Sequence, residues 1–129
     1  MQEQTFNHEA QDGVSLFVRH WTPDNRDDVR ATIQIVHGMA EHTGRYRRLA
    51  EALTDAGYAV LAHDQRGHGK TAGSEKACGM FAESGGWAKV LTDVGELNEW
   101  LRHEYPGKKR ILLGHSMGSF VTQHYLILH

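Results

Sequence analysis

The sequence predicts an α/β fold: a mostly parallel sheet with an antiparallel hairpin at its N-terminal side and helices on both faces. Short apolar segments rich in β-branched residues alternate with amphipathic helical segments, a pattern typical of a parallel sheet between helices. Two strand-like segments joined by a turn open the chain. The 129 residues are 40% hydrophobic and 23% charged. This size and composition predict a single α/β domain spanning residues 1–129.

The first elements are the hairpin and a buried strand. Every second residue from Val14 to Val18 is aliphatic, which is the period of a strand. Asp12-Gly13 precedes this segment and favours a tight turn from a weaker strand near Thr5–His8. Residues 31–36 are short, apolar and β-branched, as in a strand buried on both faces.

Three helices alternate with two further strands. The first helix, over residues 46–53, places on one stripe Tyr46, Leu49, Ala50 and Leu53. Gly57 then ends it, and strand Tyr58–Ala62 follows. The second helix has an inward stripe of Trp87, Val90, Leu91, Val94, Leu97 and Leu101. After it come strand Arg110–Leu113 and a last helix. Right-handed crossovers bring the loops after the parallel strands to one end of the sheet, where α/β proteins bind ligands.

Composition and charge exclude several classes of function. A net charge of −2 gives no electrostatic reason to expect a nucleic acid or an anionic membrane as partner. The lone Cys78 excludes an internal disulfide, and we expect it in a loop. The first residues lack the pattern of a secretory signal, and no apolar run could span a bilayer. We therefore expect a cytoplasmic location and no integral membrane segment.

Gly114-His115-Ser116-Met117-Gly118 fits the G-x-S-x-G nucleophile elbow. In this motif a sharp turn between a strand and a helix exposes a serine hydroxyl, and small flanking residues permit the turn. Here an apolar strand precedes the motif and a helix follows it, which is the context the motif requires. The alternative is a structural serine in an ordinary turn. The sequence favours Ser116 as a nucleophile.

A second segment, His37-Gly38-Met39-Ala40-Glu41-His42, directly follows the strand over residues 31–36. An oxyanion hole needs two N–H donors aimed at the developing negative charge. In elbow enzymes one donor follows the serine and the other lies in the loop after the third strand. We therefore expect the backbone N–H groups of Met117 and Met39 to be these donors. The alternative is an ordinary glycine turn.

A third segment, residues 63–71, follows the next strand. Asp64 is a candidate acid, and His63 and His68 are candidate bases or metal ligands. The interpretation that we favour is a hydrogen-bonded structural loop beside the site. The spacing matches no zinc site, and we predict no metal and no other cofactor.

The three segments resemble those of the α/β-hydrolase superfamily, and within it the monoacylglycerol lipase and lysophospholipase branch, often grouped with serine aminopeptidase-like hydrolases. The resemblance rests on residues 36–46, 62–71 and 112–118. It implies Ser116 as nucleophile, with the N–H groups of Met39 and Met117 as oxyanion hole. The implied reaction transfers an acyl group to water through an acyl-enzyme. The implied substrate is a lipid-like carboxylic ester of a fatty-acyl glycerol or lysophospholipid.

The resemblance covers only the N-terminal half of such an enzyme, ending in the helix after the elbow. It implies further strands, a lid, and the triad Asp and His in segments beyond this sequence. Within the sequence, His124 and His129 would lie roughly 12 and 20 Å along the last helix from Ser116, whereas a base must lie within about 3 Å. The other histidines expected at the active end are His37, His42, His63 and His68. We expect none of these to serve as an effective base, and therefore little or no turnover by the chain alone.

Two further hypotheses remain open. The chain could be a non-catalytic fragment or split-gene half that self-associates or pairs with another chain. Strand Arg110–Leu113 would otherwise be an exposed edge, and edges of this kind recruit other chains. The last helix is apolar nearly all round, with Phe120, Val121, Tyr125, Leu126, Ile127 and Leu128. The other hypothesis is a peptidase or lactonase on the same fold.

Overall fold

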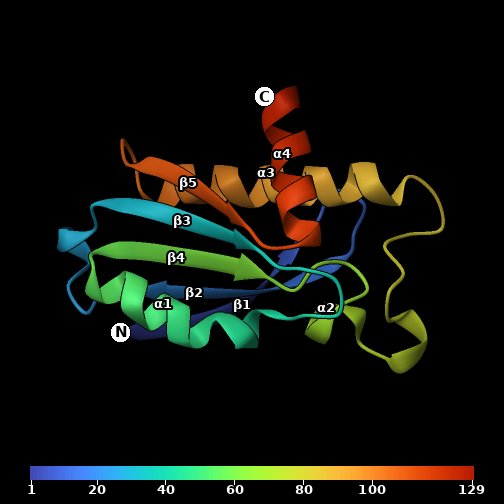
Figure 1. Cartoon of the computed structure of the whole chain (residues 1–129), viewed down its shortest axis with the longest axis horizontal. Coiled ribbons are helices and arrows are strands. Elements are labelled where there is room, and N and C mark those ends of the chain that lie inside the picture. The colour runs from blue at the N-terminus through green and yellow to red at the C-terminus, as the bar shows by residue number, and fades with distance from the viewer.

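The computed structural model describes residues 1–129 as a five-stranded sheet with helices on both faces (Figure 1). The strands are β1 (Gln2–Glu9), β2 (Ser15–Thr22), β3 (Ala31–Val36), β4 (Tyr58–His63) and β5 (Lys109–Gly114). The helices are α1 (Arg47–Asp55), the short α2 (Gly69–Ala72), α3 (Gly86–Glu104) and α4 (Met117–Leu128). The predicted fold class and the predicted order of strands and long helices are confirmed.

The strand order is β1-β2-β4-β3-β5. The opening hairpin pairs antiparallel, and β2 pairs antiparallel with β4. Both β4 and β5 pair parallel with β3. Because these three strands point the same way, the loops that follow them meet at one end of the sheet, at the right of Figure 1.

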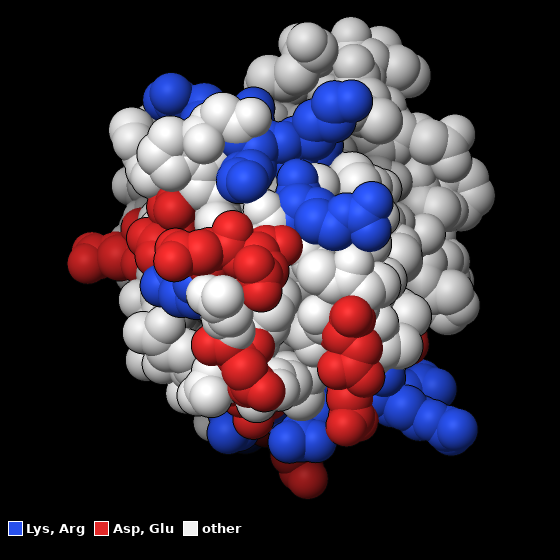
Figure 2. All heavy atoms as spheres, turned by 90° about the vertical axis from the view of Figure 1, so that its left-hand side faces the viewer, with Lys and Arg blue, Asp and Glu red and all other residues white.

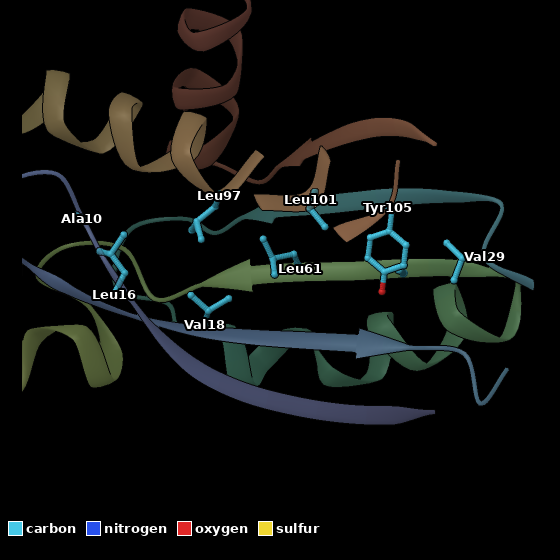
Figure 3. Close-up of a cluster of buried hydrophobic side chains, with 9 residues drawn as sticks. Ala10, Leu16, Val18, Val29, Leu61, Leu97, Leu101 and Tyr105 are labelled. Carbon is cyan, nitrogen blue, oxygen red and sulfur yellow. The ribbon is translucent and has the colours of Figure 1, made fainter. Parts of the chain in front are cut away.

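One face of the sheet packs against α3. Leu16 and Val18 of β2 and Leu61 of β4 contact Leu97 and Leu101 of the helix, and all five side chains are fully buried. Figure 3 shows these side chains converging between the helix and the strands, with Tyr105 closing one end. The alternation of aliphatic residues in β2 therefore marks the face that α3 covers.

The opposite face packs against α1. Tyr46 and Ala50 contact Ile33, Ile35 and other buried residues of the central strands. Leu49, predicted on the same stripe, is 38% exposed, so its predicted burial is wrong. Its neighbour Leu53 is partly buried in this cluster, and Thr54 is buried at the end of the helix. The buried face of α1, which begins at Arg47 after a 3₁₀ turn over Thr43–Tyr46, is centred near Ala50 and Thr54, so Leu49 lies at its margin.

The last strand and helix are covered on one side only. β5 contacts β3 alone among the strands and forms the predicted sheet edge. Val121 of α4 is buried against Val36 and α3. On the outer side of α4, Phe120 and Ile127 are 67% and 81% exposed, and Leu126 and Leu128 are exposed as well. Trp87, predicted on the inward stripe of α3, also stays partly exposed and donates to His124.

Short turns of helix that the sequence analysis did not separate from loops fill the connections. They are 3₁₀ segments at Arg26–Asp28, Thr43–Tyr46 and Glu75–Ala77, together with α2. Each is at most four residues long, too short for a hydrophobic period to show. At the end of the molecule opposite the active-end loops, basic side chains gather in the upper part of the face seen in Figure 2, and acidic side chains form groups below them, with further basic ones at the lower edge. None of the helices has both the length and the apolar character needed to cross a lipid bilayer.

Two buried histidines predict a stability that falls in acid. Burial lowers the pKa of His20 to about 4 and that of His63 to about 3. An unfolded chain binds these protons near pH 6.5, so stability is complete above that pH and declines as the pH falls toward 4. For His20 the loss is about 3 kcal/mol over this window.

We expect His20→Gln to reduce the loss of stability between pH 7 and pH 4. In the unmodified chain His20 Nε2 lies 2.9 Å from the Tyr105 hydroxyl, and glutamine keeps a hydrogen-bonding group for it. The measurement is urea unfolding between pH 7 and pH 4. His103→Gln, at an exposed position of α3, should behave like the unmodified chain. An equally steep decline in His20→Gln would contradict the assignment.

Candidate active site

Ser116 occupies a strained turn between β5 and α4. Its φ of 55° and ψ of −120° lie outside the regions that non-glycine residues ordinarily adopt. Ala40, in the loop after β3, is the only other non-glycine residue with a positive φ, at 60°. Backbone strain of this kind persists where the surroundings hold it and gathers at functional sites. Both strained residues lie at the same end of the sheet.

Two glycines make this turn possible. A Cβ on Gly118 would collide with the carbonyl oxygen of Val36 at the end of β3. A Cβ on Gly114 would meet the carbonyl oxygen of Gly118 and lie 2.6 Å from Thr122 Oγ1. The elbow is therefore pressed directly against the end of the neighbouring strand. His115 N–H also donates to the Val36 carbonyl, at 3.1 Å.

The Ser116 side chain is presented to solvent. The residue is exposed, and its hydroxyl takes part in none of the hydrogen bonds of the structure. Its carbonyl oxygen accepts from the Ser119 hydroxyl at 2.6 Å and from the Ser119 N–H at 2.9 Å. Met117 is the first residue of α4, where backbone N–H groups have no partner within the helix.

The loop after β3 lies against this turn. A Cβ on Gly38 would come within 3.0 Å of Ser116 Cβ and 3.2 Å of the His115 carbonyl oxygen. The N–H of Met39 donates to no backbone or side-chain acceptor, and the Met39 side chain is 56% exposed. The structure thus brings together Ser116, the first turn of α4 and the Gly38–Met39 segment.

The histidines of the active-end loops contact other parts of the protein and form no hydrogen bond with Ser116. His37 Nε2 accepts from the Gln65 N–H at 3.0 Å, and Nδ1 donates to the Gly38 carbonyl at 2.7 Å. Burial lowers its pKa, in keeping with a neutral ring. The remaining three are each occupied or enclosed: His42 Nδ1 accepts from the Gly44 N–H, His68 Nδ1 lies 2.9 Å from the Arg66 carbonyl, and His63 is buried without a partner. None forms a hydrogen bond with Ser116.

Asp64 joins two loops through backbone donors. Its carboxylate accepts from the Thr43 N–H at 2.7 Å and from the Lys70 N–H at 2.9 Å. Its own carbonyl accepts from the Thr71 hydroxyl. These contacts support the structural interpretation of this loop. No group of three His, Cys, Asp or Glu side chains comes together in the arrangement of a metal site.

One group that the sequence analysis did not single out stabilises the same loop. The guanidinium of Arg66 is buried and forms paired hydrogen bonds with Asp93 of α3 and with Asp12 of the hairpin turn, at 2.6 to 2.9 Å. These bonds lower the pKa of Asp12 to about 2. The partners lie 27 and 54 residues away along the chain, so no local pattern in the sequence could have revealed them.

Gly118→Ala should disrupt the elbow. The added methyl group cannot be accommodated against the Val36 main chain without moving α4 or β3, and overpacking of this kind costs about 1–3 kcal/mol or more. Urea unfolding measures the loss. Gln123→Ala, at an exposed position of the same helix, should stay within about 0.5 kcal/mol of the unmodified chain. Equal stability of the two variants would argue against the close contact.

Comparisons with known proteins agree with this geometry. The family model described as serine aminopeptidase, S33 matches residues 27–129. The human monoglyceride lipase is 36% identical over 111 residues, which are 86% of this chain and 34% of that protein. A monoacylglycerol lipase of Mycolicibacterium smegmatis is 37% identical over 120 residues, or 88% of this chain and 38% of that protein.

Solved structures show the same likeness. A thermostable carboxyl esterase from Bacillus coagulans superimposes with a TM-score of 0.86 at 30% identity, over 97% of this chain and 40% of that one. A soluble variant of the monoglyceride lipase from Saccharomyces cerevisiae gives 0.79 at 29% identity, over 95% and 38%. The chain thus spans between a third and two fifths of the length of these relatives. Since the family model matches most of its residues and the fold agrees, the chain belongs to the serine aminopeptidase S33 family of α/β-hydrolases.

Proposed function

We propose that this chain supplies the nucleophile and the oxyanion hole of a serine hydrolase that cleaves carboxylic esters. The observation that carries the proposal is the exposed Ser116 in a strained turn, next to the unpartnered N–H groups of Met39 and Met117. Strain at a single exposed serine has no structural benefit of its own. It is the form that a nucleophile elbow takes.

The reaction follows from this arrangement. Ser116 Oγ attacks the ester carbonyl carbon and gives its proton to a base, while the carbonyl oxygen takes the negative charge. The N–H groups of Met39 and Met117 stabilise that oxyanion. The C–O bond to the alcohol then breaks, and the alcohol leaves with the proton. Water cleaves the resulting acyl-enzyme in the same manner and restores the serine hydroxyl.

The base is proposed to come from outside residues 1–129. Of the histidines near the site, His37, His42 and His68 are bonded to the protein backbone and His63 is enclosed in the core. The remaining one, His115, is bonded to the Glu41 carboxylate. The relatives that this chain matches are two to three times longer. We therefore expect residues 1–129 alone to show at most the weak catalysis that an oxyanion hole and substrate binding supply without a base.

The proposed substrate is a lipid-like ester of the monoacylglycerol type. Several relatives are named as monoglyceride or monoacylglycerol lipases, and one solved neighbour as a carboxyl esterase. A depression of about 430 Å³ lies beside the Met39 loop, and its rim includes the exposed Met39 side chain. An apolar rim of this kind suits an acyl chain better than a charged peptide. A peptidase or a lactonase on the same fold is the alternative, and substrate competition separates the three.

A fluorophosphonate probe tests the nucleophile. In the complete protein, or in the chain complemented by its missing segment, we expect labelling of Ser116 that is abolished in Ser116→Ala. Ser84→Ala, which alters another exposed serine, should label like the unmodified protein. A monoacylglycerol should slow the labelling more than a peptide amide or a lactone does. Equal labelling of Ser116→Ala would refute the nucleophile. Turnover by residues 1–129 near an ordinary enzyme rate, about 10 per second, would show that a base lies within them.

A second candidate function, pairing with another polypeptide, is favoured by the uncovered side of the fold. β5 is an uncovered sheet edge with Ile111 exposed, and the outer face of α4 exposes Phe120 and Ile127 strongly. Soluble proteins rarely leave such surfaces open. We propose that this side is where residues 1–129 meet a complementary chain or, without one, each other.

Size-exclusion chromatography over a range of concentrations tests the pairing. We expect the apparent mass of residues 1–129 to rise with concentration, and Ile127→Asp to reduce that rise because it places a charge on the face. Glu51→Asp, on the exposed side of α1, is the control. A monomer at every concentration would contradict pairing driven by this surface.

A further inference from the structure

The carboxylate of Glu41 is the point where the two halves of the candidate site meet. Oε2 accepts from the Gly38 N–H at 2.6 Å and from His115 Nδ1 at 3.0 Å. The Tyr46 hydroxyl donates to the same carboxylate at 3.2 Å, and Arg45 Nη1 lies 3.3 Å from Oε1. The residue is only 9% exposed. No other carboxylate links the loop after β3 to the β5–α4 turn.

We propose that Glu41 is a positioning residue for catalysis: its carboxylate fixes the aim of the Met39 N–H relative to Ser116. The inference rests on the proposed function, because it assigns Glu41 a part in forming the oxyanion hole. Glu41 does not itself contact the reacting atoms.

The peptide geometry explains how the aim is fixed. The Gly38 carbonyl and the Met39 N–H belong to one planar trans peptide, so they point in opposite directions. The Gly38 carbonyl accepts from His37 Nδ1 at 2.7 Å and from the Glu41 N–H at 3.3 Å. Holding this oxygen on the protein side turns the Met39 N–H away from it. The Glu41 carboxylate also accepts from the Gly38 N–H. Glu41 therefore forms hydrogen bonds with both the N–H and the carbonyl group of Gly38.

The same carboxylate reaches the elbow through His115. A carboxylate only accepts hydrogen bonds, so His115 Nδ1 carries the proton in this contact. His115 directly precedes Ser116, and its ring is thereby tied to the carboxylate that holds Gly38. The relative position of the two oxyanion donors, Met39 and Met117, thus depends on one shared anion. The strained Ala40 lies inside the same short turn.

The carboxylate is charged at neutral pH. Burial alone would raise the pKa of Glu41, but the hydrogen bonds from His115, Gly38 and Tyr46 outweigh it and hold the pKa below its ordinary value. In turn, burial and the neighbouring carboxylate raise the pKa of Tyr46 to about 12. Arg45, Tyr46 and His115 are the ionisable groups that contact Glu41. Hydrogen bonds to an ionised acceptor are roughly twice as strong as neutral ones.

Amide NMR on residues 1–129 tests the arrangement without requiring activity. In the unmodified chain we expect the amide signals of Gly38, Met39 and Met117 to follow one shared titration, with a midpoint below the ordinary range of glutamate. In Glu41→Gln the titration should vanish, and in Glu41→Ala all three signals should shift. Glu51→Gln, an exposed acid on α1, is the matched control and should leave them in place.

Steady-state kinetics test the effect of Glu41 on catalysis. They are measured on a form of the protein that a fluorophosphonate labels at Ser116. We expect Glu41→Ala to lower kcat about 10-fold to 100-fold with little change in KM, less than the 10²–10³ lost with a whole oxyanion donor. Glu41→Gln, which keeps one oxygen acceptor for the Gly38 N–H, should restore part of that loss. Glu51→Gln should keep full activity.

The outcomes separate this inference from the proposed function. The positioning role would be overturned if the amide signals of Gly38, Met39 and Met117 changed neither with pH nor in Glu41→Ala. An unchanged kcat in Glu41→Ala would overturn it as well. If Ser116→Ala labels like the unmodified protein, the proposed function fails, whatever the amide signals show. Should Glu41→Ala not fold, Glu41→Gln at neutral pH decides the question: signals of Gly38, Met39 and Met117 that stay in place in that variant would overturn the positioning role.

Discussion

The contact between Gly118 and the main chain at the end of β3 is the constraint on which the candidate site depends. Parallel pairing sets Val36 opposite Gly114, and the His115 N–H then donates to the Val36 carbonyl. The first turn of α4 must pass directly over that carbonyl, and only a residue without a side chain can do so. The sharp turn that results leaves Ser116 with a positive φ and an exposed hydroxyl. The placement of Ser116 is thus a consequence of close backbone packing.

Polar side chains of the neighbouring loops serve mainly to hold that geometry. Asp64 and Arg66 fasten the loop after β4, His37 and Glu41 fasten the loop after β3, and Gln65 joins the two through the His37 carbonyl at 2.6 Å. These groups resemble catalytic residues by type, yet their donors and acceptors are occupied by the backbone or by other side chains of the protein. An oxyanion hole needs such rigidity, because its benefit depends on donors that do not reorganise during the reaction.

The two sides of the fold differ in how completely they are covered. The β2–β4–β3 region lies between α1 and α3, and its side chains are closely buried. The β5–α4 side has the same apolar composition but faces solvent. In the longer relatives, the matching segment is a third to two fifths of the chain. Ser116, the proposed nucleophile, therefore lies close to the boundary between the covered and the uncovered side.

The sequence by itself determined the fold class, the order of the strands and long helices, and the three segments that meet at the active end. These are local properties: hydrophobic period, glycine placement and motif spacing are all written along the chain. It misplaced Leu49, because the sheet buries the face of α1 that carries Ala50 and Thr54 and leaves Leu49 at its margin.

Only the tertiary structure decided which polar groups are partners. Two of these contacts, the Arg66–Asp93 pair and the hydrogen bond from His115 to Glu41, join residues far apart in sequence. The burial of His63 depends on the whole core. Nothing local distinguishes a histidine that accepts a backbone N–H from one that could accept a serine proton. The sharp turn at Ser116 could be predicted because it is local, whereas the contacts of Glu41 are made only when β3 and β5 lie side by side.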